Sequence, residues 1–261
     1  MKTVREPPHY RMPLRVIRDM LWATITGRSR SLALDAQHAM AAISAAPVIV
    51  GADHIPARGP CLITCNHYTR PGLGAWWIAV LISASIASHR AMDAPSDVHW
   101  VMTDAWRYPQ GDWRRHVVTP ASRWAISQVA RMYDLVTMPA MPPDPAEVKA
   151  RAVSVLRAVR MAKRLAAEGG LLGLAPEGRD TPGPIGMPPA GAGEFIALLV
   201  RTGLPVLPVA LAEVADRLRV SFGPPFVPDV PDDRTIRDQV VIDQVMVAIA
   251  DQLPKTSDRW D

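Results

Sequence analysis

An asparagine and a histidine, Asn66 and His67, follow the apolar run CLITC within the stretch GPCLITCNHYTRPGLGAWW. The run has the composition of a buried strand, and Pro71 suits the first turn of the helix that we expect next. His67 should therefore stand at the carboxyl end of a strand, where ligand crevices open in parallel α/β sheets and helix amides favour anions or a developing oxyanion. A neutral imidazole is a general base at physiological pH, which makes His67 the candidate catalytic residue, whereas a histidine in such a place can also be purely structural.

A second polar group follows another apolar run, LLGLA, which leads into the long loop PEGRDTPGPIGMPPAG. Glu177 lies at the root of this loop, so the same reasoning predicts that it lines the same edge of the sheet. The alternative is that Glu177 only braces the loop. Arg179 is either a phosphate contact or a surface charge.

The two cysteines, Cys61 and Cys65, lie four residues apart in the expected strand. At a rise of about 3.3 Å per residue their Cα atoms would be roughly 13 Å apart, which is beyond disulfide reach. We predict buried free thiols in a reducing compartment. A zinc site with His67 lacks further ligands at suitable spacing, so we expect neither a metal nor a redox cofactor.

Strand-like and helix-like segments alternate along the 261 residues, of which 49% are hydrophobic. This pattern predicts a single-domain α/β fold whose mixed, largely parallel sheet is covered by helices. The uncharged run 71–89 is predicted to be a buried helix, since it is too short for a comfortable membrane span. The predicted strands are 47–50, 61–65, 98–103, 135–138, 171–175, 205–211 and 218–222, and the predicted helices after the first strand include 119–133, 145–168, 193–202 and 236–253.

Charge is distributed unevenly around the formal net value of +4, because arginines load the N-terminal region and aspartates the C-terminal region. The aromatic residues do not alternate with basic residues as stacking platforms, and no nucleic-acid-binding motif is present, so nucleic acid is not an expected partner. An anionic membrane face is the better candidate. The N-terminal arginines are Arg5, Arg11, Arg15, Arg18, Arg28 and Arg30.

The segment 13–26 places four apolar residues at helical spacing close to these arginines. It is either an amphipathic interfacial helix or a first helix that packs on the domain. We predict N-terminal amphipathic helices at 13–26 and 32–45, with 1–45 as a helical, membrane-associating segment and 46–261 as an α/β domain. No signal peptide is visible, so the expected location is the cytoplasm, peripherally at the inner face of the cell membrane. The four apolar residues are Leu14, Ile17, Leu21 and Ile25.

Three segments in order resemble the motifs of the glycerolipid acyltransferase family, which includes the bacterial 1-acylglycerol-3-phosphate acyltransferases. GADHIPARGPCLITCNHYT resembles the first block, in which a strand leads to Asn-His-x-Ser, with Thr69 in place of the serine. APEGRDTPG resembles the third block, built on Pro-Glu-Gly, and GLPVLPVAL resembles the fourth. The similarity covers roughly residues 47–228.

The resemblance implies an acyltransferase in which His67 takes the proton from an acceptor hydroxyl as that hydroxyl attacks an acyl thioester. The donor would be acyl-CoA or an acyl carrier protein, the acceptor a lysophospholipid or another lipid-like molecule, and no cofactor would be needed. The substrate-binding residues implied by the motifs are Asn66, Thr69, Arg70, Glu177, Gly178 and Arg179.

The chain departs from the family where an aspartate should orient the imidazole, because Gly72 occupies the position five residues after His67. Asp104, which follows a predicted strand, is the first candidate for a substitute catalytic carboxylate, and Glu177 or Asp180 is the next. The second block lacks its usual arginine, so either Arg131 replaces it or the acceptor carries no glycerol phosphate.

These departures leave two alternatives to an acyltransferase. The first is a catalytically inactive family member that binds acyl chains or lipid headgroups. The second is a hydrolase in which His67 activates water, although the sequence contains no GxSxG nucleophile elbow.

Overall fold

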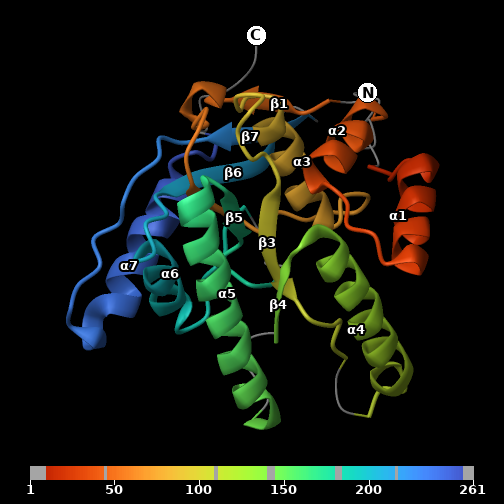
Figure 1. Ribbon diagram of the computed structural model, residues 1–261. Helices are drawn as coiled ribbons and strands as arrows, with labels where there is room; N and C mark the ends of the chain where they lie inside the picture. The colour runs from red at the N-terminus through yellow and green to blue at the C-terminus, as the bar shows by residue number, and fades with distance from the viewer. Residues whose placement is uncertain are drawn as a thin grey trace, which may run out of the picture.

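A seven-stranded sheet runs through the molecule in the order β1-β7-β6-β2-β5-β3-β4 (Figure 1). The computed structural model describes residues 10–43, 46–108, 111–139, 145–179, 184–214 and 217–254. Every neighbouring pair of strands is parallel except β6 and β7, which confirms the mixed, largely parallel α/β fold. The strands are β1 (Val48–Val50), β2 (Cys61–Cys65), β3 (Val98–Thr103), β4 (Val136–Met138), β5 (Leu171–Leu174), β6 (Val206–Val214) and β7 (Arg217–Phe222).

Helices cover the sheet on both faces, and a hydrophobic core lies on each face (Figure 1). One core joins the sheet to α2 and α3 through residues such as Ile63 and Leu81, and the other joins it to α5, α6 and α7 through residues such as Leu62 and Val245. The helices are α1 (Leu14–Thr26), α2 (Leu32–Ala41), α3 (Trp76–Ala87), α4 (Arg114–Tyr133), α5 (Val148–Glu168), α6 (Ala192–Val200) and α7 (Arg234–Ala250).

Strand β2 lies near the middle of the sheet, between β6 and β5, and pairs in parallel with both. All five of its residues are buried, because a central parallel strand has helices over both faces. Cys61, Ile63 and Cys65 belong to the core under α3, and Leu62 belongs to the core under α6. The apolar run therefore fixes the place from which Asn66 and His67 emerge.

The N-terminal segment is fastened to this body at several points. Helix α2 packs along α3 and contributes Ala36 and Ala39 to the core. The main-chain N–H of Tyr10 donates to the carbonyl of Gly72, and the indole N–H of Trp77 donates to the carbonyl of Tyr10. The predicted division at 45/46 falls at residues 44–45, which lie outside the described part of the chain, and it stays a prediction.

Two predicted helix starts were wrong. Helix α4 begins at Arg114 rather than 119 and carries Pro120 inside it, which removes one hydrogen-bond donor from a helix whose face is exposed there. Helix α3 begins at Trp76, because Pro71 and Gly72 instead occupy the centre of a tight turn that is closed by reciprocal main-chain hydrogen bonds between Arg70 and Leu73.

Other helices agree more closely with the prediction. α2 ends at Ala41, earlier than expected, and α5 begins after a 3₁₀ turn at Pro145–Glu147, whereas the predicted N-cap Asp144 lies outside the described residues. The uncharged run after β2 forms α3, and the burial of most of this helix confirms the buried-helix prediction. Within the described residues, no helix combines the length and the apolar character needed to cross a bilayer.

Candidate active site at the end of β2

Asn66 clamps the end of β2 to the neighbouring strand β6. Its side chain is completely buried, its amide nitrogen donates to the carbonyl of Leu211 at 2.9 Å, and its amide oxygen accepts from the N–H of Leu211 at 2.7 Å. A further hydrogen bond runs from the same nitrogen to the carbonyl of Pro184 in the loop before α6. Asn66 therefore holds the main chain around His67 in place, so its described contacts give it a structural role next to the predicted substrate-binding role.

Glu177 braces His67 from the other side, through the end of β5. Its carboxylate is buried at 1% exposure, and one oxygen accepts from the main-chain N–H of His67 at 3.0 Å. The other oxygen accepts from the N–H of Gly186 at 2.9 Å. These bonds match the bracing role that the sequence left open, because they fix the backbone that carries the imidazole.

The imidazole of His67 is half-buried, and its Nδ1 atom is shielded from solvent. A substrate would therefore approach Nε2. The residue lies where the chain leaves β2 towards α3, while the neighbouring strand β5 leads to α6 on the opposite face of the sheet. Connections that part in this way mark the edge at which ligands bind in open α/β sheets.

Asp104 follows β3, and strand β5 separates β3 from β2. The carboxylate of Asp104 contacts Arg107 at 2.7 Å and Arg123 at 3.6 Å. Two guanidinium groups thus hold this carboxylate, and its role as the partner of His67 stays a prediction. Asp180, the later candidate, lies outside the described residues.

Arg107 and Arg123 also reach Glu147 at the start of α5, at 2.7 and 3.4 Å. Four charges of alternating sign thus tie the segment after β3 to α4 and to the base of α5. Sequence spacing does not indicate this network, because its members lie up to about 40 residues apart and share no local pattern. It stabilises the carboxyl edge of the sheet next to the candidate site.

Gly72 stands in the turn that follows His67, and its φ angle of 80° lies in the left-handed region. The Pro71-Gly72 pair suits a turn in which the second central residue needs a positive φ, a conformation that favours glycine over residues with a Cβ atom. The glycine five residues after His67 is therefore explained by the backbone conformation of this turn.

Arg70, predicted to bind substrate, is engaged by Glu213 near the end of β6. Its Nε atom donates to a Glu213 oxygen at 2.7 Å, its side chain is 10% exposed, and its guanidinium lies over the ring of Tyr10. Tyr68 donates to the other Glu213 oxygen at 3.1 Å, and burial followed by the negative charge of Glu213 raises the pKa of Tyr68 to about 12. Arg70 thus holds the loop after β2 against β6, which sequence spacing did not indicate.

The remaining predicted substrate-binding residues lie at the ends of β2 and β5. Thr69 is half-buried in the loop after His67, whereas Gly178 and Arg179 are exposed. Gly178 has a φ of 66° and closes a turn by donating its N–H to the carbonyl of Ala175. This turn leaves Arg179 at the surface beside the β2 and β5 ends, where its guanidinium is open to an anion.

The two cysteines are free and buried, as predicted. Burial raises the pKa of Cys61 to about 12, and burial followed by the charge of Glu177 raises the pKa of Cys65 as well. Both thiols are therefore poor nucleophiles. Among the described residues, no group of three or more His, Cys, Asp or Glu side chains is arranged to hold a metal ion.

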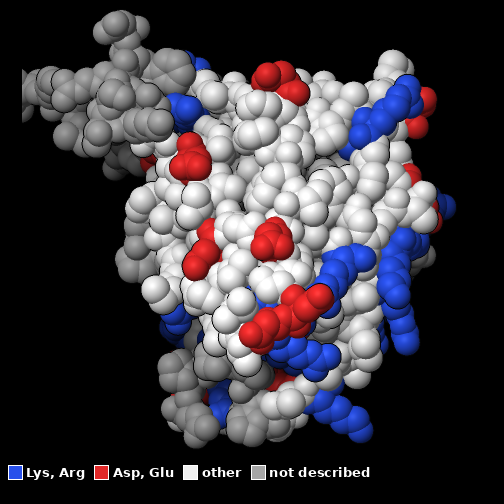
Figure 2. All heavy atoms as spheres, turned by 90° about the vertical axis from the view of Figure 1, so that its left-hand side faces the viewer, with Lys and Arg blue, Asp and Glu red and all other residues white. Residues whose placement is uncertain are grey.

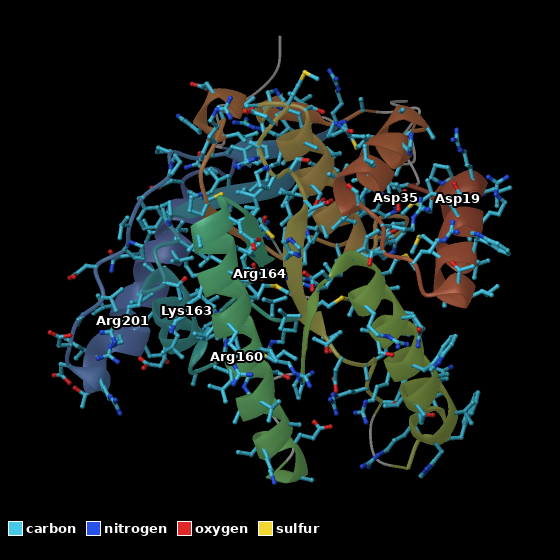
Figure 3. The ribbon with its side chains drawn as sticks, viewed as in Figure 1. Asp19, Asp35, Arg160, Lys163, Arg164 and Arg201 are labelled. Carbon is cyan, nitrogen blue, oxygen red and sulfur yellow. The ribbon has the colours of Figure 1, made fainter. Side chains whose placement is uncertain are left out.

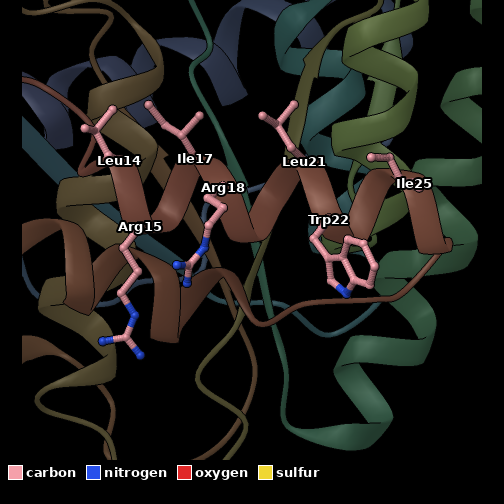
Figure 4. Close-up of a pocket in the computed structure, with 7 residues that line it drawn as sticks. All are labelled: Leu14, Arg15, Ile17, Arg18, Leu21, Trp22 and Ile25. Carbon is pink, nitrogen blue, oxygen red and sulfur yellow. The ribbon is translucent and has the colours of Figure 1, made fainter.

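Helix α1 carries a second surface of interest, the α1 stripe, which consists of Leu14, Ile17, Leu21 and Ile25. These side chains project to one side of the helix, with Arg15, Arg18 and Trp22 beside them (Figure 4). Leu14 is 83% exposed and Ile25 78% exposed. The opposite side of α1 is anchored, because Val16 and Ala23 are buried and Ala23 contacts Met132 and Tyr133.

Basic residues also gather along α5, on another side of the molecule from α1 (Figures 2 and 3). Arg160, Lys163 and Arg164 are exposed there, with Arg201 nearby. Arg164 contacts Asp134 at 2.6 Å and Arg201 contacts Asp232 at 3.6 Å, so part of this charge is neutralised.

No protein-family model matches the chain, and no curated protein matches it. Among solved structures, the chain is similar to the 1-acyl-sn-glycerophosphate (LPA) acyltransferase PlsC from Thermotoga maritima. The two share 13% sequence identity over 95% of this chain and 88% of that one, with a TM-score of 0.49.

Proposed function

We propose that this protein is an acyltransferase that moves a fatty acyl group from a thioester to a hydroxyl of a lysophospholipid or another lipid-like acceptor. The observation that carries the proposal is His67 at the carboxyl end of central strand β2, with its main chain fixed by the buried carboxylate of Glu177. The order of two motifs supports it, because Asn-His follows β2, Pro-Glu-Gly follows β5, and these two strands are neighbours in the sheet.

In this reaction, Nε2 of His67 takes the proton of the acceptor hydroxyl while the hydroxyl oxygen attacks the carbonyl carbon of the thioester. The carbon–sulfur bond then breaks, and the leaving thiolate receives the proton from the imidazolium. A positioned general base of this kind contributes typically about 10²- to 10⁴-fold in rate. The hydrogen bonds of Asn66 and Glu177 fix the main chain that carries the imidazole at the ends of the strands.

Arg179 is the residue that we assign to an anionic group of the acceptor or donor. It is exposed beside the same strand ends, and Gly178 gives its turn the required backbone conformation. Arg131 is less suited, because it lies in the last turn of α4, which leads into the amino end of β4. No step requires a metal or a redox cofactor.

A contact with an anionic membrane at the inner face of the cell membrane completes the proposal. The α1 stripe supplies apolar side chains for the interface, and Arg15 and Arg18 supply positive charge beside them. Deleting 13–26, or replacing Leu14 and Ile25 by serine, should reduce flotation with anionic liposomes. Unchanged flotation would refute this contact.

The enzymatic test uses labelled acyl-CoA and acyl carrier protein with a panel of lyso-acceptors. Wild type should form acylated product, and His67→Ala should lower the rate by about 10²-fold or more. The matched control is His89→Ala, an exposed histidine at the far end of α3, which should keep full activity. Equal behaviour of wild type and His67→Ala would leave the inactive lipid-binding alternative, and release of free acid without acceptor would indicate the hydrolase.

A further inference from the structure

Besides the α1 stripe, a second apolar surface lies exposed on helix α4. We call it the α4 face, and it consists of Trp113, Val117 and Trp124. Their side chains are 65%, 59% and 63% exposed. The spacing of four and then seven residues puts them on one side of the helix, roughly opposite the buried side formed by Ser122, Ile126 and Ala130. Large aromatic side chains in water on the outer side of a docked helix mark an interaction surface.

The charge around the α4 face is positive. The helix contains four arginines and neither aspartate nor glutamate, and its first turn holds Arg114 and Arg115. Among the described residues, no carboxylate pairs with Arg114, Arg115 or Arg131. Asp112 lies beside this first turn, and its Oδ1 accepts the main-chain N–H of Arg114 at 2.9 Å. The two guanidinium groups outnumber this single carboxylate, and cations at a helix N-terminus are unfavourable because the positive end of the helix dipole repels them. An anionic surface offsets that repulsion.

Tryptophan combined with arginine is the composition of elements that lie at a membrane–water interface, where the indole ring sits at headgroup level. Helix α1 packs against the last turn of α4 through Ala23, Met132 and Tyr133, and both helices lie on the same side of the molecule (Figure 1). The hollow between them is lined by Arg28, Gln128 and Arg131, which can meet a phosphate.

We infer that the α4 face is a second membrane-docking element, which binds the interface of an anionic phospholipid bilayer and turns the carboxyl edge of the sheet towards it. Helix α4 begins on the chain segment that leaves β3 at that edge. Docking α4 as well as α1 therefore fixes the orientation of the molecule on the bilayer. The orienting role rests on the proposed function, since its purpose is to bring a bilayer lipid to His67. The docking of α4 does not depend on that function.

The test compares two valines of equal exposure. Val117 on α4 and Val247 on α7 are both 59% exposed, and α7 lies on the opposite side of the molecule (Figure 1). Partition of the full chain into vesicles of phosphatidylglycerol and phosphatidylcholine should fall on the order of tenfold in Val117→Asp, because a charge replaces an inserted apolar group. Val247→Asp should bind like wild type. Equal partition of the two variants would overturn the inference.

Further variants separate the aromatic contribution from the charge. Trp113→Ser and Trp124→Ser should each lower partition on the order of tenfold, and Trp113→Tyr should retain most of it. Arg114→Gln and Arg115→Gln should each lower binding to anionic vesicles roughly fivefold and leave binding to neutral vesicles unchanged. Equal losses on both kinds of vesicle would contradict the charge assignment.

Two other outcomes are distinguishable. If sedimentation in the ultracentrifuge without lipid shows a dimer and Trp113→Ser makes it dissociate, the α4 face binds a second copy of the chain and the inference is wrong. Vesicle partition needs no turnover, so a chain that docks through α4 but transfers no acyl group refutes the proposed function alone. A chain that transfers acyl groups but partitions independently of Val117 refutes this inference alone.

Discussion

The end of β2 and the outer side of α1 show opposite patterns of solvent exposure. At the end of β2, polar side chains are buried and bonded to main chain, as Asn66 is to Leu211 and Glu177 to His67. On α1, large apolar side chains such as Leu14 and Ile25 stand in water, although Val16 and Ala23 anchor the helix. In the first region the polar groups find their hydrogen-bond partners within the protein. In the second region the apolar side chains leave water only when an apolar phase such as a lipid bilayer is added. Changes to the first should show in buffer, and changes to the second only with lipid.

Among changes to the candidate site, the largest effect on folding is expected for Asn66→Ala. The change strips both the N–H and the carbonyl of Leu211 of buried partners, so the free energy of unfolding should fall by about 3 kcal/mol. Urea unfolding followed by circular dichroism measures this loss. Thr69→Ala, a half-buried neighbour, should cost less than about 1 kcal/mol, and a similar loss in both would mean that Asn66 is no special clamp.

An intermediate effect is expected for Gly72→Asp, which introduces the aspartate of the motif that the sequence around His67 resembles. The left-handed φ of 80° should make this change cost about 1 kcal/mol in the free energy of unfolding. Gly72→Asn is the matched control, because asparagine and aspartate both tolerate the left-handed region and asparagine carries no charge. If Gly72→Asp is clearly more stable than Gly72→Asn, the new carboxylate has found a cationic partner, and backbone strain does not explain the glycine alone.

The smallest effect in buffer is expected for Leu21→Gln on the α1 stripe. Leu21 is 61% exposed, so the free energy of unfolding should change by no more than about 0.5 kcal/mol, while flotation with anionic liposomes should weaken. Leu81→Gln on the buried helix α3 is the opposite case and should lose several kcal/mol, on the order of 3. A large loss of stability for Leu21→Gln would show that the α1 stripe packs against the protein and not against lipid.

Much of the fold was predictable because its elements have local causes. The alternation of apolar runs with helical periodicity predicted the largely parallel sheet covered by helices, and full burial of β2 follows from its uninterrupted CLITC sequence. Helix starts at Arg114 and Trp76 were missed, since a proline is equally compatible with a first turn, a tight turn and an exposed helix interior. Residues 144 and 180 lie outside the described chain, so predictions on them stay open.

For the site, the sequence pattern located His67 and Glu177 at two strand ends, because the end of an apolar run marks the end of a buried strand. Partners across strands carry no such local mark. Only the folded chain shows that Glu177 holds the backbone of His67, that Arg70 belongs to Glu213, and that Asp104 belongs to two arginines. The exposure of the α1 stripe and the α4 face was likewise decided by packing, since periodicity gives a helix an apolar side but not the surface that side will meet.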